Sequence, residues 1–318
     1  MSAAADRADA VRRGAGLFAL DHRGVVHVGG GDALRWLNGM ITADVAALEP
    51  DTEGAHVHAL LLTPIGRIIA ELHVVARPDG FWLELQRDVL GEVIARLEKY
   101  VIADDVTLRD VSDAWRRLGL EGPAADAILD AARPALDAAG AVTARFGWSG
   151  ERSVQLFVPA AALEGVRSAL AEAGRERSLV DAGADTLDVL RIESGRPRQG
   201  AELDEEVLPP EARLDDCVST TKGCYTGQEV IARIASRGQV KHLLVGLRLE
   251  AGELPPIGTP IQVEGRRVGE VTSVTHSNPA GAIALGYVQR PHDQAGTAVD
   301  VEGRVARVAA LPFVTGAL

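Results

Sequence analysis

Cysteine and lysine are both scarce in this chain of 318 residues. It has two cysteines, Cys217 and Cys224, and three lysines, Lys99, Lys222 and Lys241, whereas its other basic residues are 30 arginines. The C-x6-C spacing of the cysteines matches no common zinc motif, so we expect no metal site. We expect no structural disulfide either, because thiols stay reduced in a reducing compartment.

Long hydrophobic runs are also missing. No apolar stretch approaches the roughly 20 residues that a membrane-spanning helix needs. The first 13 residues contain acidic side chains and no apolar core, which is not typical of a secretory signal. We therefore expect a cytoplasmic protein with no membrane partner. Its length and 47% hydrophobic content suffice for two domains with a sizeable core.

Positive charge is in deficit. The chain has 33 lysines and arginines against 45 acidic residues, a net charge of −12. Proteins that hold nucleic acid by general electrostatics need clustered basic side chains. Eight basic residues do occur between positions 191 and 241, but nine acidic residues lie among them. We therefore do not expect direct binding to nucleic acid.

The most informative segment has the sequence KGCYTGQE and spans residues 222–229. A helix is predicted directly after it, because Thr226 and Glu229 have capping-box spacing, an apolar stripe of helical periodicity follows, and Gly238 suits the helix end. Cys224 would then lie just before a helix N-terminus. The helix dipole and the charge of Lys222 would lower the pKa of the thiol from its ordinary value of about 8.5. Such a loop suits a reactive or anion-contacting cysteine.

A structural interpretation of the same segment stays open. A free cysteine is usually a small buried hydrophobic side chain. The flanking glycines could simply shape a turn before an ordinary helix, and the neighbouring sequence offers Cys224 no general base.

Hydrophobic periodicity predicts alternating strands and helices in the first 238 residues. Strands are expected at 18–20, 25–28, 56–62, 68–75 and 81–85, and helices at 32–37 (ended by Asn38-Gly39), 89–100, near 123–139 and near 159–173. From about residue 239 the pattern changes. Short alternating strands at 243–249, 260–263, 267–275, 282–288 and 298–308 are typical of a small β-barrel.

Four stretches of the chain resemble the YgfZ-type folate-binding proteins, relatives of the T-protein (aminomethyltransferase) of the glycine cleavage system. Residues 221–233, TKGCYTGQEVIAR, are similar to the signature of these proteins. Residues 37–45 resemble their LxGxxTxDV element, residues 190–197 their LRIEAGxP element and residues 208–211 their iPqE element. The resemblance runs from about residue 17 to the C-terminal barrel.

The resemblance implies an α+β, T-protein-like fold. Two mixed α/β subdomains and a small C-terminal β-barrel would surround a central folate cavity. The folate-binding domain would span residues 1–238, with its subdomains divided near residue 113, and the barrel domain would span residues 239–318.

The cofactor implied is tetrahydrofolate or a one-carbon derivative. A reduced folate has a pterin edge with hydrogen-bond donors, a flat aromatic body and an anionic tail, so its site needs carboxylates or amides, apolar walls and an arginine. Arg191 matches the folate-contacting arginine of the family, although it could also be an ordinary surface charge. The candidate cofactor-binding residues are Arg191, Trp148, Glu151, Gln155 and Asn38.

Two sequence elements depart from the T-protein pattern. The paired aspartates of its GGIxDD element, one of them catalytic, correspond to Ala70 and Glu71, and the acid that ends its GEDGxE element corresponds to Gln155. A catalytic carboxylate must lie within hydrogen-bond reach of the reacting group. The missing aspartate at Ala70 therefore argues against aminomethyl transfer but not against folate binding, and leaves open whether the protein is an enzyme.

The function implied is that of a tetrahydrofolate-binding protein that supports assembly or repair of iron–sulfur clusters in client enzymes, including radical enzymes that modify tRNA. Its partners would be folate and these clients or the assembly machinery. Two alternatives stay open: a folate-dependent aminomethyl or methyl transferase, and a non-catalytic module that binds RNA or clients. The catalytic residues would be Cys224 and Lys222, supported by Gly223, Tyr225, Thr226, Gly227, Gln228, Glu229 and Arg233.

Overall fold

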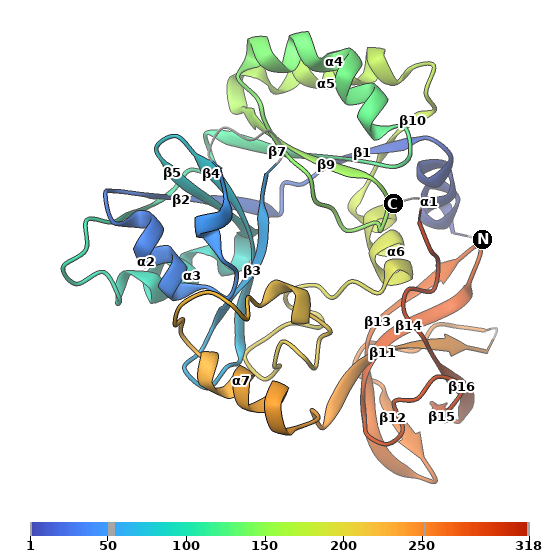
Figure 1. Cartoon of the computed structure of the whole chain (residues 1–318). Coiled ribbons are helices and arrows are strands. Elements are labelled where there is room, and N and C mark those ends of the chain that lie inside the picture. Colours follow the sequence, from blue (N-terminus) through green and yellow to red (C-terminus); the bar gives the residue numbers. More distant parts are fainter. Residues whose placement is uncertain (1, 50–54, 251, 317–318) are drawn as a thin grey trace.

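The structure is a computed structural model that describes residues 2–49, 55–250 and 252–316. Two mixed α/β units and a closed β-barrel are arranged around a central region, as Figure 1 shows. Within the described residues, no helix is both long and apolar enough to cross a membrane.

The first unit is a five-stranded sheet in the order β3-β4-β5-β2-β6. Apolar side chains of one sheet face pack against two helices, whereas the opposite face turns toward the second unit. This arrangement explains the period-two alternation that predicted these strands. The elements are β2 (Arg23–Gly29), α2 (Ala33–Met40), η1 (Val45–Ala47), β3 (Val57–Leu62), β4 (Ile68–Arg77), β5 (Gly80–Gln86), α3 (Arg87–Glu98) and β6 (Thr107–Asp110).

The second unit has the strand order β10-β1-β7-β9-β8, in which only β1 and β10 run parallel. Helices α4 and α5 cover one face of its sheet, while α1 and α6 pack on the other side (Figure 1). The elements are α1 (Ala3–Arg13), β1 (Ala15–Ala19), β7 (Trp115–Glu121), α4 (Ala125–Ala139), β8 (Val142–Ala144), β9 (Ser153–Pro159), η2 (Ala160–Ala162), α5 (Leu163–Gly174), β10 (Leu179–Ala182) and α6 (Ala184–Ser194).

The first two elements of the chain, α1 and β1, belong to the second unit, and the elements of the first unit follow them. A division near residue 113 falls between β6 and β7, but α1 and β1 lie with the later half of the chain. The predicted domain boundaries, with subdomains divided near residue 113 and a barrel domain from residue 239, stay a prediction.

The C-terminal part is a closed barrel in the order β11-β14-β13-β12-β15-β16. Two short helices, η3 (Asp215–Cys217) and α7 (Gln228–Arg237), precede it in the chain. The strand predicted at 298–308 is a hairpin of two strands. The barrel strands are β11 (His242–Leu249), β12 (Pro260–Val263), β13 (Arg266–Ser277), β14 (Gly281–Gln289), β15 (Ala298–Val301) and β16 (Arg304–Ala309).

Candidate functional site

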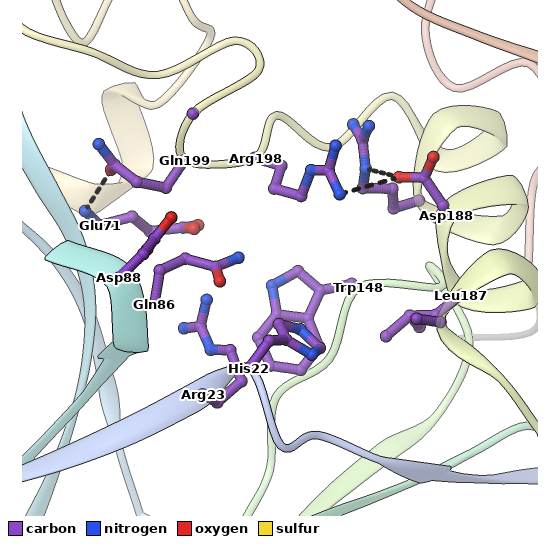
Figure 2. A pocket seen from close by; sticks show the side chains of 13 residues that line it. His22, Arg23, Glu71, Gln86, Asp88, Trp148, Leu187, Asp188, Arg198 and Gln199 are labelled. Atoms are coloured by element: carbon purple, nitrogen blue, oxygen red, sulfur yellow. Dashed lines mark hydrogen bonds and ion pairs between the residues drawn. The ribbon is translucent and has the colours of Figure 1, made fainter. Parts of the chain in front are cut away.

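A cavity of about 470 Å³ lies between the two α/β units, beneath the segment that follows α6. Its volume is within the range of small-molecule and cofactor sites. Figure 2 shows side chains converging on it from the first sheet, from the loop that carries Trp148, from α6 and from the loop that carries Arg198 and Gln199. The lining residues are His22, Arg23, Glu71, Gln86, Asp88, Trp148, Ala184, Leu187, Asp188, Arg191, Arg198, Gln199 and Gly200.

Ala70 and Glu71 are neighbours on β4, and they face opposite sides of the sheet. Ala70 is fully buried in the apolar core beneath α2 and α3, together with its strand neighbour Leu72. Glu71 points to the opposite face, as alternation along a strand requires, and its side chain lines the cavity. An aspartate at position 70 would put its carboxylate into the hydrophobic core. Ala70 therefore gives no physical reason to exclude aminomethyl transfer, because Glu71 places a carboxylate at the cavity-facing position.

Glu71 is held as a carboxylate by its neighbours. Its Oε1 lies 2.8 Å from Nε2 of His58 on the adjacent strand. Burial alone would raise the pKa of Glu71, but the hydrogen bond from His58, together with the charge of Arg23, lowers it below its ordinary value. The site thus contains an ionised acid at its wall.

Arg23 is fixed by a buried ion pair. Its guanidinium donates two hydrogen bonds to Glu84, at 2.8 and 2.5 Å, and Arg117 adds a third contact to the same carboxylate at 3.2 Å. Burial opposes the charge of Arg23, but Glu84 outweighs it and raises the pKa of the guanidinium. Arg23 also lies 4.9 Å from the ring centre of Trp148, so a cation–π contact joins two walls of the cavity.

Three side chains near Glu71 could be taken for a metal site. His58, Glu71 and His73 offer ligand atoms within 4.8 Å of one another. However, the rings of His58 and His73 are stacked, with centroids 4.5 Å apart and an interplanar angle of 13°. A metal ion bound by an imidazole nitrogen lies in the ring plane, and nearly parallel planes do not meet near both rings. One ring would have to rotate before both could bind the same ion.

Arg191, the predicted anion contact, lines the cavity but is mostly engaged elsewhere. The side chain is 3% exposed, and it donates to Asp188 at 2.6 Å, Glu202 at 3.1 Å and Ser273 of the barrel at 2.7 Å. Ser273 also donates to Glu202. Arg191 therefore joins α6 to the barrel.

Arg198 is the more available cation of the cavity, and the sequence did not single it out. Its side chain is 45% exposed and its guanidinium lies 3.7 Å from Asp188. Beside it, Gln199 accepts from the backbone N–H of Glu71 and donates to the carbonyl of Ile69, so this loop is fastened to the edge of β4. No helix or strand pattern marks these residues, which explains why periodicity missed them.

The predicted cofactor-binding residues Glu151 and Gln155 are not among the residues that line the cavity. Gln155 donates to the carbonyl of Phe146 at 2.9 Å and to Glu121 at 3.2 Å, and Glu121 accepts from the N–H of Trp148. This network holds the loop that presents Trp148. Glu151 is buried near Arg12. Burial lowers the pKa of Arg12, and the charge of Glu151 offsets only part of this effect.

Asn38 lies on α2, outside the residues that line the cavity, and it contacts the loop that carries Lys222. The ammonium of Lys222 donates to the carbonyls of Asn38 at 2.7 Å and Ala43 at 2.8 Å, and also to that of Ile41. All three of its N–H groups thus fasten the loop to the end of α2. Asn38 itself accepts from the N–H of Val45.

Cys224 is exposed, four residues before α7. The N-cap of α7 is Gly227 at φ 86°, in the left-handed region that favours glycine, so Thr226 lies one position too early for the predicted capping box, which is wrong. Tyr225 is buried beneath Lys222, 5.0 Å from its Nζ. Besides Cys224, Gly223, Glu229 and Arg233 of the motif are exposed, and Gln228 is half-buried.

Comparisons with known families cover most of the chain. The family described as "GCVT N-terminal domain" matches residues 1–222, and the "Glycine cleavage T-protein C-terminal barrel domain" matches residues 243–315. Curated relatives named aminomethyltransferase include one from Rubrobacter xylanophilus, 32% identical over 96% of this chain and 84% of its own length. Another, from Streptomyces avermitilis, is 33% identical over 96% of this chain and 87% of its own length.

A solved structure has the same fold. The aminomethyltransferase T of the glycine cleavage system from Bartonella henselae has a TM-score of 0.87 at 24% sequence identity, over 99% of this chain and 90% of that chain. The predicted T-protein-like fold with a C-terminal barrel is confirmed. The narrower assignment to YgfZ-type proteins stays a prediction, because these relatives are named aminomethyltransferases.

Proposed function

Because this chain belongs to the glycine cleavage T-protein family, we propose that it binds tetrahydrofolate in the central cavity and transfers a one-carbon unit to it from an aminomethyl donor. The observation that carries the proposal is the position of Glu71, whose ionised carboxylate lines the cavity. The names of the relatives support the same reaction class. None of these names concerns iron–sulfur clusters.

The chemistry of the cavity fits a reduced folate. Trp148 and Leu187 provide a wall for a flat ring system, and carboxylates and amides at 71, 86, 88, 188 and 199 can accept from the donors of a pterin edge. Arg198 can pair with an anionic tail. Arg191 would act chiefly by holding Asp188 in place.

Tetrahydrofolate would supply the two amine nitrogens that take up the carbon. In this transfer the carbon leaves the sulfur and the nitrogen of the donor and bonds to both amines. The two amine protons end on the released thiol and ammonia. Glu71 would act as the general base that receives a proton from an acceptor amine and passes it to the leaving group.

The test compares the two neighbouring positions on β4. Glu71→Gln should lower the formation of methylene-tetrahydrofolate from the aminomethyl-lipoyl carrier by about 100-fold or more, the usual contribution of a general base. Ala70→Asp is the matched variant, and it should not raise the rate, because its carboxylate would enter the core. A wild-type protein that binds tetrahydrofolate but forms no product would reject the transferase. Full activity of Glu71→Gln would reject the assigned role.

A second candidate function is support of iron–sulfur enzymes, and the exposed thiol of Cys224 favours it. Thiol alkylation should then modify Cys224 rapidly and Cys217 slowly, because Cys217 is buried and burial raises the pKa of its thiol. Cys224→Ser should keep folate affinity but fail to restore iron–sulfur enzyme activity in a strain that lacks this protein. Full rescue by Cys224→Ser, or alkylation of Cys224 only after unfolding, would make it a structural residue.

A further inference from the structure

Three side chains form a hydrogen-bonded line behind the cavity wall. Sγ of Cys217 lies 3.0 Å from Nδ1 of His58, and Nε2 of the same ring lies 2.8 Å from Oε1 of Glu71. The three residues come from η3, β3 and β4, and only Glu71 lines the cavity among them. The line therefore connects a buried thiol to the carboxylate at the cavity wall.

The hydrogen-bond partners assign a protonation state to each member. Cys217 is 2% exposed, and burial raises the pKa of its thiol, so the sulfur carries its proton. The S–H then donates to Nδ1, and Nε2–H donates to the ionised Glu71. In the neutral tautomer of His58 with its proton on Nε2, each of these two hydrogen bonds pairs one donor with one acceptor.

The position of Cys217 is itself restrained. Its carbonyl accepts from the hydroxyl of Thr42 at 2.6 Å, and the same hydroxyl accepts from the N–H of Leu60 at 2.8 Å. Leu60 lies on β3, two residues from His58, so Thr42 joins the thiol segment to the strand that carries the imidazole. These contacts hold the backbone of η3 beside β3, which keeps Sγ within reach of the ring.

The ring of His58 is also restrained from the side. It stacks on His73, which stacks in turn on Phe146 with centroids 3.9 Å apart and an interplanar angle of 8°. Burial, with the nearby charge of Arg23, lowers the pKa of His73 well below its ordinary value, so this neighbour stays neutral. Packing against His73 fixes the plane of the imidazole, and the hydrogen bonds fix its rotation in that plane.

We propose that His58 is a positioning residue, whose tautomer is set by Cys217 and whose Nε2–H holds the carboxylate of Glu71 ionised and oriented at the cavity wall. The role of Glu71 in one-carbon transfer rests on the proposed function, but the hydrogen-bonded line does not. Other titratable or charged groups near this line include Arg23 on β2, His73 on the same strand as Glu71, Glu84 on β5, His56 just before β3 and Arg196 after α6.

Two variants of His58 separate positioning from packing. His58→Phe keeps a flat ring to stack on His73 but removes the donor, whereas His58→Gln removes the ring and keeps an N–H near the place of Nε2. Glutamate carboxyl carbons are labelled with carbon-13 in the full-length protein without ligand. The signal of Glu71 is identified by its loss in Glu71→Gln, and its chemical shift is followed against pH.

The titration midpoint of Glu71 should move upward in His58→Phe and stay close to the wild-type value in His58→Gln. If His58 served only for packing, Phe would behave like the wild type and Gln would be the disturbed variant, which would overturn the proposal. Nitrogen-15 spectra of the wild-type histidines give a second test that needs no variant. They should show His58 with a protonated Nε2 and an unprotonated Nδ1 near pH 7, and the opposite tautomer would contradict the assignment.

The cysteine is tested in the same way. Cys217→Ser keeps a donor to Nδ1 and should preserve the tautomer signal of His58, whereas Cys217→Ala should change it. An unchanged signal in Cys217→Ala would remove Cys217 from the line. In the transfer assay, the acid limb of the kcat/KM profile should move to higher pH in His58→Phe. If the NMR results hold and the wild type shows no transfer, only the proposed function fails.

Discussion

At the scale of single residues, the structure changes the role expected of Arg191. Resemblance alone pointed to a contact with the ligand, but the guanidinium is buried between Asp188, Glu202 and Ser273. The side chain of Glu202 is fully buried. Its carboxylate pairs with Arg191 and accepts hydrogen bonds from Ser273 and from the N–H of Arg198.

Arg191→Met should therefore lower the free energy of unfolding by about 3–5 kcal/mol, because removing one partner leaves a buried charge uncompensated. Urea denaturation measures the loss. The double variant Arg191→Met/Glu202→Gln should recover part of it, since the stranded charge is then gone. Wild-type stability of Arg191→Met, with weaker folate binding, would return Arg191 to the role of a ligand contact.

At the scale of elements, Lys222 fastens the motif loop to α2. Lys222→Met should destabilise the protein by about 1.5–3 kcal/mol at pH 7, because the carbonyls at the end of α2 lose a charged donor. Burial lowers the pKa of Lys222 to about 8, from 10.5 for an exposed lysine. Between these pH values Lys222 keeps its proton in the unfolded chain but has lost it in the folded chain. The free energy of unfolding of the wild type should therefore rise with pH relative to that of the variant.

Urea denaturation at pH 7, 8, 9 and 10 checks this prediction. The difference between the wild type and Lys222→Met should be constant up to about pH 8 and grow above it. A difference that shrinks with pH would mean that the folded protein holds the proton more tightly than the unfolded chain. In that case the three carbonyls that accept from Lys222 would raise its pKa by more than burial lowers it.

Most elements could be predicted from periodicity, and the errors occur where local signals compete. The alternation from 298 to 308 continues across a tight turn, at which Glu302 and Gly303 adopt φ values of 56° and 74°. One strand was therefore predicted instead of two. Helix α2 continues through the expected stop at Asn38-Gly39 to Met40. Asp32 occupies the predicted N-cap of α2, but its carboxylate accepts from the N–H of Asp105 instead.

The candidate site was less predictable than the fold. The cavity-facing side of β4 can be read from alternation, since Ile68, Ala70 and Leu72 are apolar and Glu71 falls between them. Arg198 and Asp188 could not be assigned in this way. They come from a loop and from the middle of α6, whose approach to β4 depends on tertiary packing rather than on local pattern.

At the scale of the whole molecule, the cavity exists because three separate parts of the chain meet. The first sheet contributes Glu71, the second unit contributes Trp148, and the segment after α6 contributes Arg198. Arg191 and Glu202 join that segment to the barrel. The barrel thus takes part in the site by holding one of its walls.

The most direct test of this account is calorimetric titration of the purified protein with tetrahydrofolate. We predict one saturable site with an affinity in the micromolar class. Arg198→Ala should weaken it about tenfold or more, as expected for the loss of a hydrogen bond to a charged group, whereas the control Cys224→Ala should bind like the wild type. The absence of saturable heat in the wild type, or equal affinity in Arg198→Ala, would contradict a reduced folate bound in this cavity.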